Sequence, residues 1–268
     1  MKYWKEYYGH DPDIRGQRNR FDNTIYTFDI ETTSFLILNG EQISPNKYDE
    51  LSKDDQRESI PMSNMYIWML GINDTVYYGR TWQELDYFLM NIEYYGTTYK
   101  KFIYVHNLSW EFQFLRNYFK IKDVFSRKSR KVMKCSLEKY NFEFRCSYYM
   151  SGVALEKIPD IYGLNTRKLV GELDYNIQRN SKTILTDSEL SYCENDCLVV
   201  YEYIQKELEQ YETLKNIPLT STGHVRKELK DIVSKDNKYK YYVKKAINTD
   251  PHVYNLLIDA FARWIYTC

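Results

Sequence analysis

The sequence has no net charge, no long apolar run and no hydrophobic leader, and each absence excludes a class of protein. Lys and Arg number 37, as do Asp and Glu, so the formal net charge is zero. A surface coated with basic residues for nucleic acid is excluded, although a local basic groove is not. The longest apolar run, residues 67–72, is far too short to cross a bilayer. Residues 1–20 are polar and charged, unlike a signal peptide.

Cysteine is also scarce. The 5 cysteines, at positions 135, 146, 193, 197 and 268, form no C-x-x-C pair, and their number is odd. This pattern argues against a secreted disulfide framework and against a zinc knuckle. Cys193 and Cys197 are one helical turn apart, a spacing that favours core packing over metal ligation. We therefore expect an intracellular protein with no membrane partner.

The composition is that of a folded protein. The chain has 268 residues, 43% hydrophobic and 28% charged. This length suits one large or two small domains, and folding hides roughly 75% of the unfolded surface at about this size. Tyrosine is abundant, with 28 residues. Exposed tyrosines can stack on bases, but an AT-rich coding sequence is the simpler explanation.

Hydrophobic periodicity predicts a mixed arrangement of strands and helices, with no internal repeat. Strands are expected at residues 24–30, 65–73, 75–80, 101–107, 124–127, 131–136 and 142–147. Helices are expected at residues 81–95, 110–119, 186–214, 223–233 and 250–261, with capping boxes opening the first and third and Ser109 capping the second. Residues 44–63 are expected to form a loop or small insertion. The pattern predicts a mixed-sheet α/β or α+β domain with a helical tail.

Acidic residues at the end of the first strand are the first chemical signal. Asp29 and Glu31 are two residues apart, so both carboxylates lie on the same side of a strand. Carboxylates held this close repel one another unless a cation lies between them. Taken alone the pattern is weak, because most such pairs are simply solvated.

Two further patterns follow in order along the chain. His106 and Asn107 end an apolar strand, and Glu111 falls in the first turn of the next helix, where an acid also simply complements the helix dipole. His106 is expected to be packed or hydrogen-bonded rather than a ligand. Tyr192 and Asp196 share one face of a long helix, where the alternative is a surface acid beside a half-buried phenol.

Together the three patterns resemble the exonuclease motifs of the DEDD superfamily in its tyrosine-containing form. The resemblance is closest to the proofreading domain of protein-primed family B DNA polymerases of phages and linear plasmids, and it covers residues 24–262. The matching segments are Phe28-Asp29-Ile30-Glu31-Thr32-Thr33, Tyr104-Val105-His106-Asn107-Leu108 and Tyr192-Cys193-Glu194-Asn195-Asp196. Segments 171–175 and 220–223 match more weakly.

The resemblance implies an α/β, ribonuclease-H-like mixed sheet with flanking helices and a two-metal 3′–5′ exonuclease site. The implied ligands of the two Mg²⁺ or Mn²⁺ ions are Asp29, Glu31, Glu111 and Asp196, which would clamp the attacking and leaving oxygens of a phosphodiester. Tyr192 would orient the attacking water. The family usually has Asp where this chain has Glu111, a longer side chain that still ligates a hard cation.

The resemblance also implies contacts to the single-stranded DNA 3′ end. Thr32 and Asn107 match positions that contact the terminal nucleotides, Trp110 replaces a base-stacking aromatic residue, and Tyr175 matches a nearby tyrosine. A catalytic lysine is assigned to Lys168, with Arg167 as the alternative. Residues 235–245, with five lysines and three tyrosines, are either a strand-tracking segment or an ordinary solvated turn.

The polymerase motifs Asp-x-x-Ser-Leu-Tyr-Pro and Asp-Thr-Asp do not occur in the chain. We expect an N-terminal extension (1–23), an exonuclease domain (24–215) and a helical tail (216–268) that leads to an absent polymerase domain. One coding choice for residues 263–268, read one base later, encodes the Gly-Gly-Tyr-Thr segment at which the family's two domains meet, which predicts a frameshift or split gene. Implied partners are a separately encoded polymerase half and a terminal protein, in the cytoplasm of a phage-infected or plasmid-bearing cell.

Two other functions remain open on the sequence. One is a stand-alone DEDD ribonuclease, which would need a contact to the 2′-hydroxyl group. The other is a catalytically inactive fragment that binds single strands.

Overall fold

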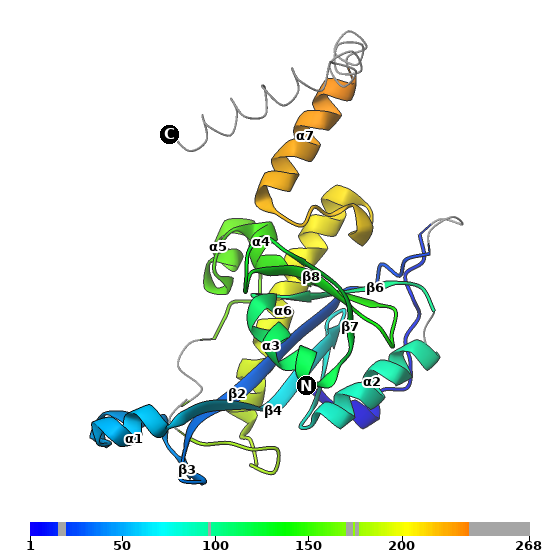
Figure 1. The fold of residues 1–268 in the computed structure, drawn as a ribbon. Coiled ribbons are helices and arrows are strands. Elements are labelled where there is room, and N and C mark those ends of the chain that lie inside the picture. Colours follow the sequence, from blue (N-terminus) through cyan, green and yellow to red (C-terminus); the bar gives the residue numbers. More distant parts are fainter. Residues whose placement is uncertain (16–19, 96–97, 170–173, 175–176, 236–268) are drawn as a thin grey trace, which may run out of the picture. The chain divides into compact units, whose positions relative to one another are not determined.

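A mixed β-sheet forms the centre of the fold (Figure 1). The computed structural model describes residues 1–15, 20–95, 98–169, 174 and 177–235. The strands are β1 (Lys2–Tyr3), β2 (Tyr26–Leu38), β3 (Glu41–Ile43), β4 (Ile60–Ile72), β5 (Thr75–Gly79), β6 (Lys101–Val105), β7 (Ile121–Ser126), β8 (Val132–Leu137) and β9 (Phe142–Cys146). The α-helices are α1 (Lys53–Glu58), α2 (Trp82–Tyr95), α3 (Leu108–Tyr118), α4 (Ser147–Ser151), α5 (Ile158–Tyr162), α6 (Asp187–Tyr211) and α7 (Ser221–Lys235).

The strand order places β2 near the middle of the sheet. The order is β1-β5-β4-β2-β6-β9-β8-β7, with β3 paired to β2. β2 is antiparallel to β4 but parallel to β6, and β6 is parallel to β9. Because the carboxyl ends of parallel strands meet at one edge, the end of β6 and the start of α3 lie near the acidic part of β2. The expected mixed α/β sheet with flanking helices is confirmed.

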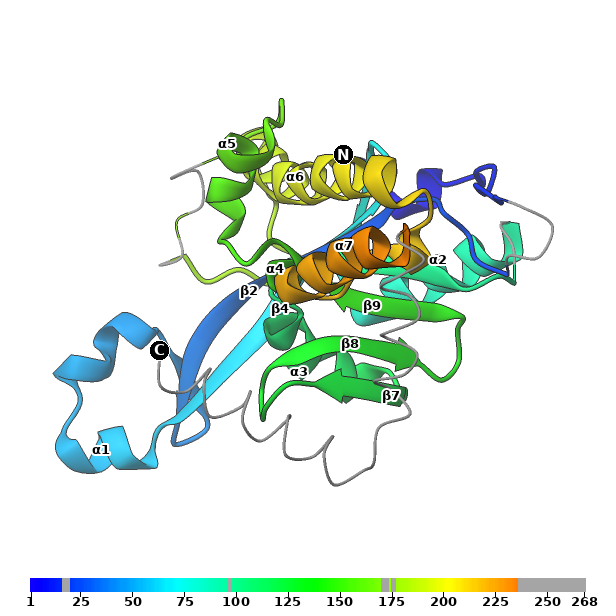
Figure 2. The ribbon, with the colours of Figure 1, turned by 90° about the horizontal axis from the view of Figure 1, so that it is seen from above.

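Helices cover both faces of this sheet (Figure 2). α2 and α3 pack on the face that carries Phe28 and Ile30 of β2. The start of α6 packs on the opposite face through Tyr192, Cys193 and Cys197. Side chains alternate along a strand, so Asp29 and Glu31 face α6. The two cysteines are buried in this core, which confirms the packing role predicted for them.

The antiparallel pair β2 and β4 extends further than its sequence pattern predicts. β2 continues beyond residue 30 to Leu38, and β4 begins at Ile60 within the segment expected to be a loop. The two strands pair as far as Ile37 and Ile60. The extension follows from long-range pairing, since residues 60–64 acquire strand geometry from their partners in β2. β3 and α1 lie at the far end of this extension (Figure 1).

The two capping boxes that the sequence predicts are confirmed. Thr81 and Glu84 form reciprocal side-chain to backbone hydrogen bonds at the start of α2. Thr186 and Glu189 do the same at the start of α6. Each box satisfies two backbone donors that the helix leaves unpaired, so these helix starts are set locally.

The chain divides into two units, Met1–Ser221 and Thr222–Cys268. In the second, the described residues belong to the helix α7, which confirms the helix predicted there. Residues 236–245 of the basic segment and the helix expected at 250–261 lie outside the described residues. None of the described helices combines the length and the apolar character that crossing a membrane requires.

Candidate metal centre

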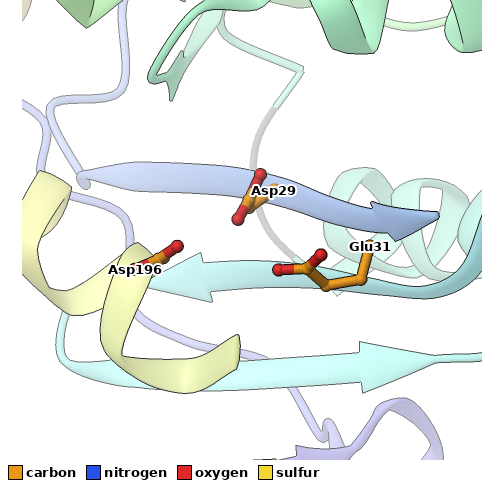
Figure 3. Close-up of side chains that lie close together, drawn as sticks. All are labelled: Asp29, Glu31 and Asp196. Atoms are coloured by element: carbon orange, nitrogen blue, oxygen red, sulfur yellow. The ribbon is translucent and has the colours of Figure 1, made fainter. Parts of the chain in front are cut away.

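Three carboxylates from two distant parts of the chain meet between β2 and α6. One ligand oxygen each from Asp29, Glu31 and Asp196 lies within 4.8 Å of the others (Figure 3). Glu31 and Asp196 are buried, and Asp29 is partly buried. Hard divalent cations prefer carboxylate oxygens, so this cluster has the donor set of a magnesium or manganese site.

A β-bulge follows Glu31. The pairing of β2 with β4 runs from Glu31 opposite Ile67 to Thr32 opposite Met65, so Tyr66 is passed over. Bulges bend a strand, re-aim its side chains and are common next to active sites. The extra residue belongs to β4, opposite the point in β2 where the acidic residues end and Thr32 begins.

The carboxylates resist ionisation in the protein without metal. Burial, followed by the charges of Glu31, Asp196 and Glu111, holds the pKa of Asp29 well above its ordinary value. Burial and the charge of Asp196 raise the pKa of Glu31 to about 7. Burial likewise raises the pKa of Asp196. Its Oδ1 atom is buried and has no hydrogen-bond partner among the described residues. A cation between these groups would offset both the burial of the carboxylates and their mutual repulsion.

Glu111 lies beside the cluster but outside the group of three. It occupies the first turn of α3 and is 4% exposed. Burial and the charge of Glu31 raise its pKa, partly offset by a hydrogen bond from its own backbone amide. Its Oε2 atom is buried without a partner in the described part of the chain. The carboxylate therefore does more than complement the helix dipole, because it also interacts electrostatically with Glu31 of the cluster.

The start of α3 differs from the prediction. Asn107 is the N-cap residue, in the left-handed conformation, and its side chain makes no capping hydrogen bond. The Ser109 hydroxyl, expected to cap the helix, instead accepts a hydrogen bond from the backbone N–H of Val132 at 2.9 Å. The cap prediction was wrong because Ser109 has a partner in β8 that a local pattern does not reveal.

Lys168 is the cation at the cluster. Its Nζ atom lies 3.1 Å from Asp196 Oδ2 and 5.9 Å from the centre of the Tyr192 ring. Its charge lowers the pKa values of Glu31 and Asp196, against the effect of burial. Arg167, the alternative, is instead paired with the exposed Asp160. Of the two candidates, the structure brings only Lys168 to the acids.

A second cation, Arg179, carries no signal in the sequence. It is 6% exposed, and its Nε atom donates to Glu189 at 2.9 Å. Its backbone N–H donates to Thr33 Oγ1, also at 2.9 Å. The positive charge of Arg179 lowers the pKa of Glu31. An isolated arginine in an irregular segment belongs to no motif, so only the fold places it near the site.

The described residues expected to contact nucleic acid are Thr32 in β2 and Asn107 and Trp110 at the start of α3. Thr32 lies at the bulge, and Asn107 is exposed in the turn between β6 and α3. Trp110 is 47% exposed, with its edge against Phe114 at a centroid distance of 5.5 Å. Tyr175 lies outside the described residues.

His106 is hydrogen-bonded, as expected. Its Nδ1 atom lies 3.1 Å from Ser147 Oγ. Burial, followed by the charge of Lys168, lowers its pKa to about 4. The ring is therefore neutral at pH 7 and adds no positive charge to the site.

A groove of about 860 Å³ begins near the cluster. It shares Thr33 and Arg179 with the surroundings of the acids and continues past Phe114 and Tyr118 of α3. Its volume is within the range of ligand sites.

Comparisons with known proteins support the fold. No protein-family model matches the chain, and no curated protein matches its sequence. Among solved structures, phi29 DNA polymerase in an orthorhombic crystal form matches 79% of this chain at 15% identity, with a TM-score of 0.54. The same polymerase with primer-template DNA matches 79% at 16% identity, with a TM-score of 0.52. The chain spans about a third of the polymerase's length, 34% and 35% in these two structures.

At this level of identity the similarity shows a shared fold. The mixed sheet, its flanking helices and these neighbours confirm the ribonuclease-H-like fold class expected from the sequence.

Proposed function

We propose that this chain is a 3′–5′ exonuclease that removes terminal nucleotides from single-stranded DNA, and that it forms the proofreading part of a protein-primed family B DNA polymerase. The observation that carries the proposal is the group of three carboxylates within 4.8 Å. These acids come from the first and third elements of an ordered exonuclease motif set. The fold shared with phi29 DNA polymerase supports the same proposal.

The residues present fit two divalent cations. Four acids, Asp29, Glu31, Asp196 and Glu111, have raised pKa values. Buried oxygens of Asp196 and Glu111 lack partners among the described residues. Asp29, Glu31 and Asp196 would hold one ion, with Glu111 contributing to the second. When bound, such ions activate water and stabilise charge on the leaving oxygen.

Tyr192 and Lys168 would position the reacting groups. Tyr192 lies one helical turn before Asp196 in α6, and Lys168 forms an ion pair with Asp196. The Tyr192 hydroxyl would hold the attacking water by a hydrogen bond. Lys168 would keep Asp196 ionised and supply positive charge near the phosphate as negative charge develops on it.

Thr32, Asn107 and Trp110 would hold the terminal nucleotides. The exposed Trp110 ring offers a stacking surface, which is typically worth about 1–3 kcal/mol per base. The strands β2 and β6 pair in parallel. Thr32 and Asn107 each lie a few residues beyond the paired part of their own segment. Substrate recognition would therefore come from the edge of the sheet that carries the metal ligands.

The proposal is tested with a 5′-labelled single-stranded oligonucleotide and Mg²⁺ or Mn²⁺. The wild type is compared with Asp29→Ala/Glu31→Ala and with the matched control Asp49→Ala/Glu50→Ala, which removes two exposed acids. We expect the wild type and control to give a metal-dependent ladder that shortens from the 3′ end. The Asp29→Ala/Glu31→Ala variant should lose this activity while keeping its circular dichroism spectrum.

Three outcomes would overturn the proposal. A folded wild type that cleaves nothing with either metal, but binds the strand, would indicate the inactive binding fragment. A strong preference for RNA ends over DNA ends would indicate a ribonuclease. Equal activity in wild type and the Asp29→Ala/Glu31→Ala variant would place the chemistry elsewhere.

A further inference from the structure

The turn between β7 and β8 concentrates positive charge on a neutral protein. Its five residues, Arg127-Lys128-Ser129-Arg130-Lys131, are all exposed. We call this five-residue segment the basic turn. Four of its residues are cations, and none of the four forms an ion pair with another described residue. Equal numbers of acids and bases in the whole chain make this a local feature. Four like charges this close repel one another, so a polyanionic ligand would stabilise them.

The backbone of the basic turn is held in a defined shape. The Arg127 N–H donates to the Lys131 carbonyl oxygen at 3.1 Å, and the Lys131 N–H donates to the Lys128 carbonyl oxygen at 3.0 Å. Arg130 adopts a left-handed conformation, with φ of 58°. These hydrogen bonds present the four cations from one compact turn.

The hairpin is anchored beside the candidate metal centre. The first residue of β8, Val132, donates its backbone N–H to Ser109 near the start of α3. The next two residues of that helix are Trp110, which is exposed, and Glu111, which is buried beside the acids. Figure 2 shows β8 alongside α3. The basic turn therefore lies at the end of α3 that faces the site.

An exposed aromatic residue accompanies the cations. Phe125, in the edge strand β7, is 51% exposed, and Val124 beside it is 48% exposed. Surfaces that bind single-stranded nucleic acid combine cations along the backbone with aromatic rings on which bases stack. The hairpin has both parts.

We propose that the basic turn binds backbone phosphates of the same DNA strand whose 3′ end enters the metal centre, on the 5′ side of the terminal nucleotides. Phe125 stacks on a base of that segment. This inference rests on the proposed function, because it takes the strand being shortened as the ligand. The hairpin thus holds the strand between successive cleavages.

The test is equilibrium binding of 5′-labelled oligonucleotides by fluorescence anisotropy in EDTA, so that no strand is cleaved. The turn variant carries Arg127→Ser, Lys128→Ser, Arg130→Ser and Lys131→Ser. The control variant carries the same loss of charge at four exposed lysines elsewhere, Lys5→Ser, Lys47→Ser, Lys53→Ser and Lys157→Ser. Oligonucleotides of about 4 and about 16 nucleotides separate binding at the 3′ end from binding further along the strand.

We expect the turn variant to bind the long oligonucleotide about tenfold or more weakly than the control variant does at about 50 mM salt. The slope of log affinity against log salt concentration should become shallower by about 0.7 for each phosphate that the variant no longer neutralises. The weakening should be smaller for the short oligonucleotide. Equal binding of the long strand by the two variants would overturn the inference. So would an equal weakening for both lengths, which would place the turn at the 3′ end itself.

The nuclease assay separates this inference from the proposed function. If the wild type cleaves DNA but the turn variant binds like the control, the inference alone fails. If the wild type does not cleave DNA but the turn variant loses long-strand binding, the exonuclease proposal fails and the binding surface remains.

Discussion

The acid cluster should destabilise the metal-free protein, and replacing Glu31 by Gln should therefore stabilise it. The pKa of Glu31 is raised from 4.5 to about 7. A tenfold change in an acidity constant corresponds to about 1.4 kcal/mol, so ionised Glu31 costs the fold at most about 3.5 kcal/mol. An acid whose pKa is raised in the folded state carries no penalty below its unfolded pKa. The penalty grows between pH 4.5 and about 7 and is complete above that range.

In EDTA at pH 8, Glu31→Gln should raise the unfolding free energy by about 1–3 kcal/mol, and at pH 4.5 the difference should nearly vanish. Saturating Mg²⁺ should offset most or all of this difference. At about 100 times the dissociation constant, an ion bound only by the folded state adds about 2.7 kcal/mol. The wild type should gain this increment, and the variant should gain much less.

Urea unfolding followed by tryptophan fluorescence measures both effects, because Trp68 and Trp82 are buried. Glu50→Gln, at an exposed position, is the control and should unfold like the wild type in every condition. The reasoning is refuted if Glu31→Gln is less stable than the wild type in EDTA at pH 8. It is also refuted if Mg²⁺ stabilises the two proteins equally.

Three other substitutions test separate parts of the structure. Lys168→Ala should lower nuclease activity by about 10²–10³. It should also move the acidic limb of the pH–rate profile to higher pH, because Lys168 lowers the pKa values of Glu31 and Asp196; Arg167→Ala, at an exposed site, should do neither. Glu143→Gln should cost about 3–5 kcal/mol in urea unfolding at pH 7, since the pKa of Glu143 is lowered to about 2 beside Arg145 and Lys100. That stabilisation is present above pH 4.5 and lost as the pH falls towards 2. Trp110→Ala should weaken binding of single-stranded DNA in EDTA by about 1–3 kcal/mol in anisotropy titrations, whereas Trp4→Ala should leave it unchanged.

Local patterns predicted the parts of the site that local structure determines. The alternation of a strand was enough to place Asp29 and Glu31 on one side of β2. The capping box at Thr186 located the start of α6, and helical spacing then put Tyr192 and Asp196 on a common face. In each case the controlling interactions span only a few residues, roughly the range over which sequence periodicity is informative.

Features that depend on long-range contacts were not predictable in the same way. The extension of β4 to Ile60 requires its pairing with β2. Ser109 finds its partner 23 residues away, in β8. Arg179 approaches the acids only because its segment lies against Thr33. No periodic pattern encodes such contacts, since tertiary packing decides them.

Two buried glutamates show why the acid cluster is best explained by a ligand. Glu143 is 1% exposed and forms ion pairs with Arg145, Lys100 and Lys134; against the effect of burial, Arg145 and Lys100 lower its pKa to about 2. Glu31 is 8% exposed, yet its pKa rises to about 7. The same fold therefore satisfies a buried carboxylate fully at one position and leaves another short of positive charge.

This shortage of positive charge occurs at the acid cluster. Four acids influence one another there, while Lys168 is paired with Asp196 and Arg179 is already paired with Glu189. With all four acids ionised, they and Lys168 together carry a net charge of about −3, which costs folding free energy unless cations neutralise it. Two divalent ions would bring four positive charges, which is enough to neutralise this net charge, and carboxylate oxygens are ligands that such ions prefer. Metal binding at this site would therefore stabilise the fold, so unfolding measurements test the proposed metal centre independently of any nuclease assay.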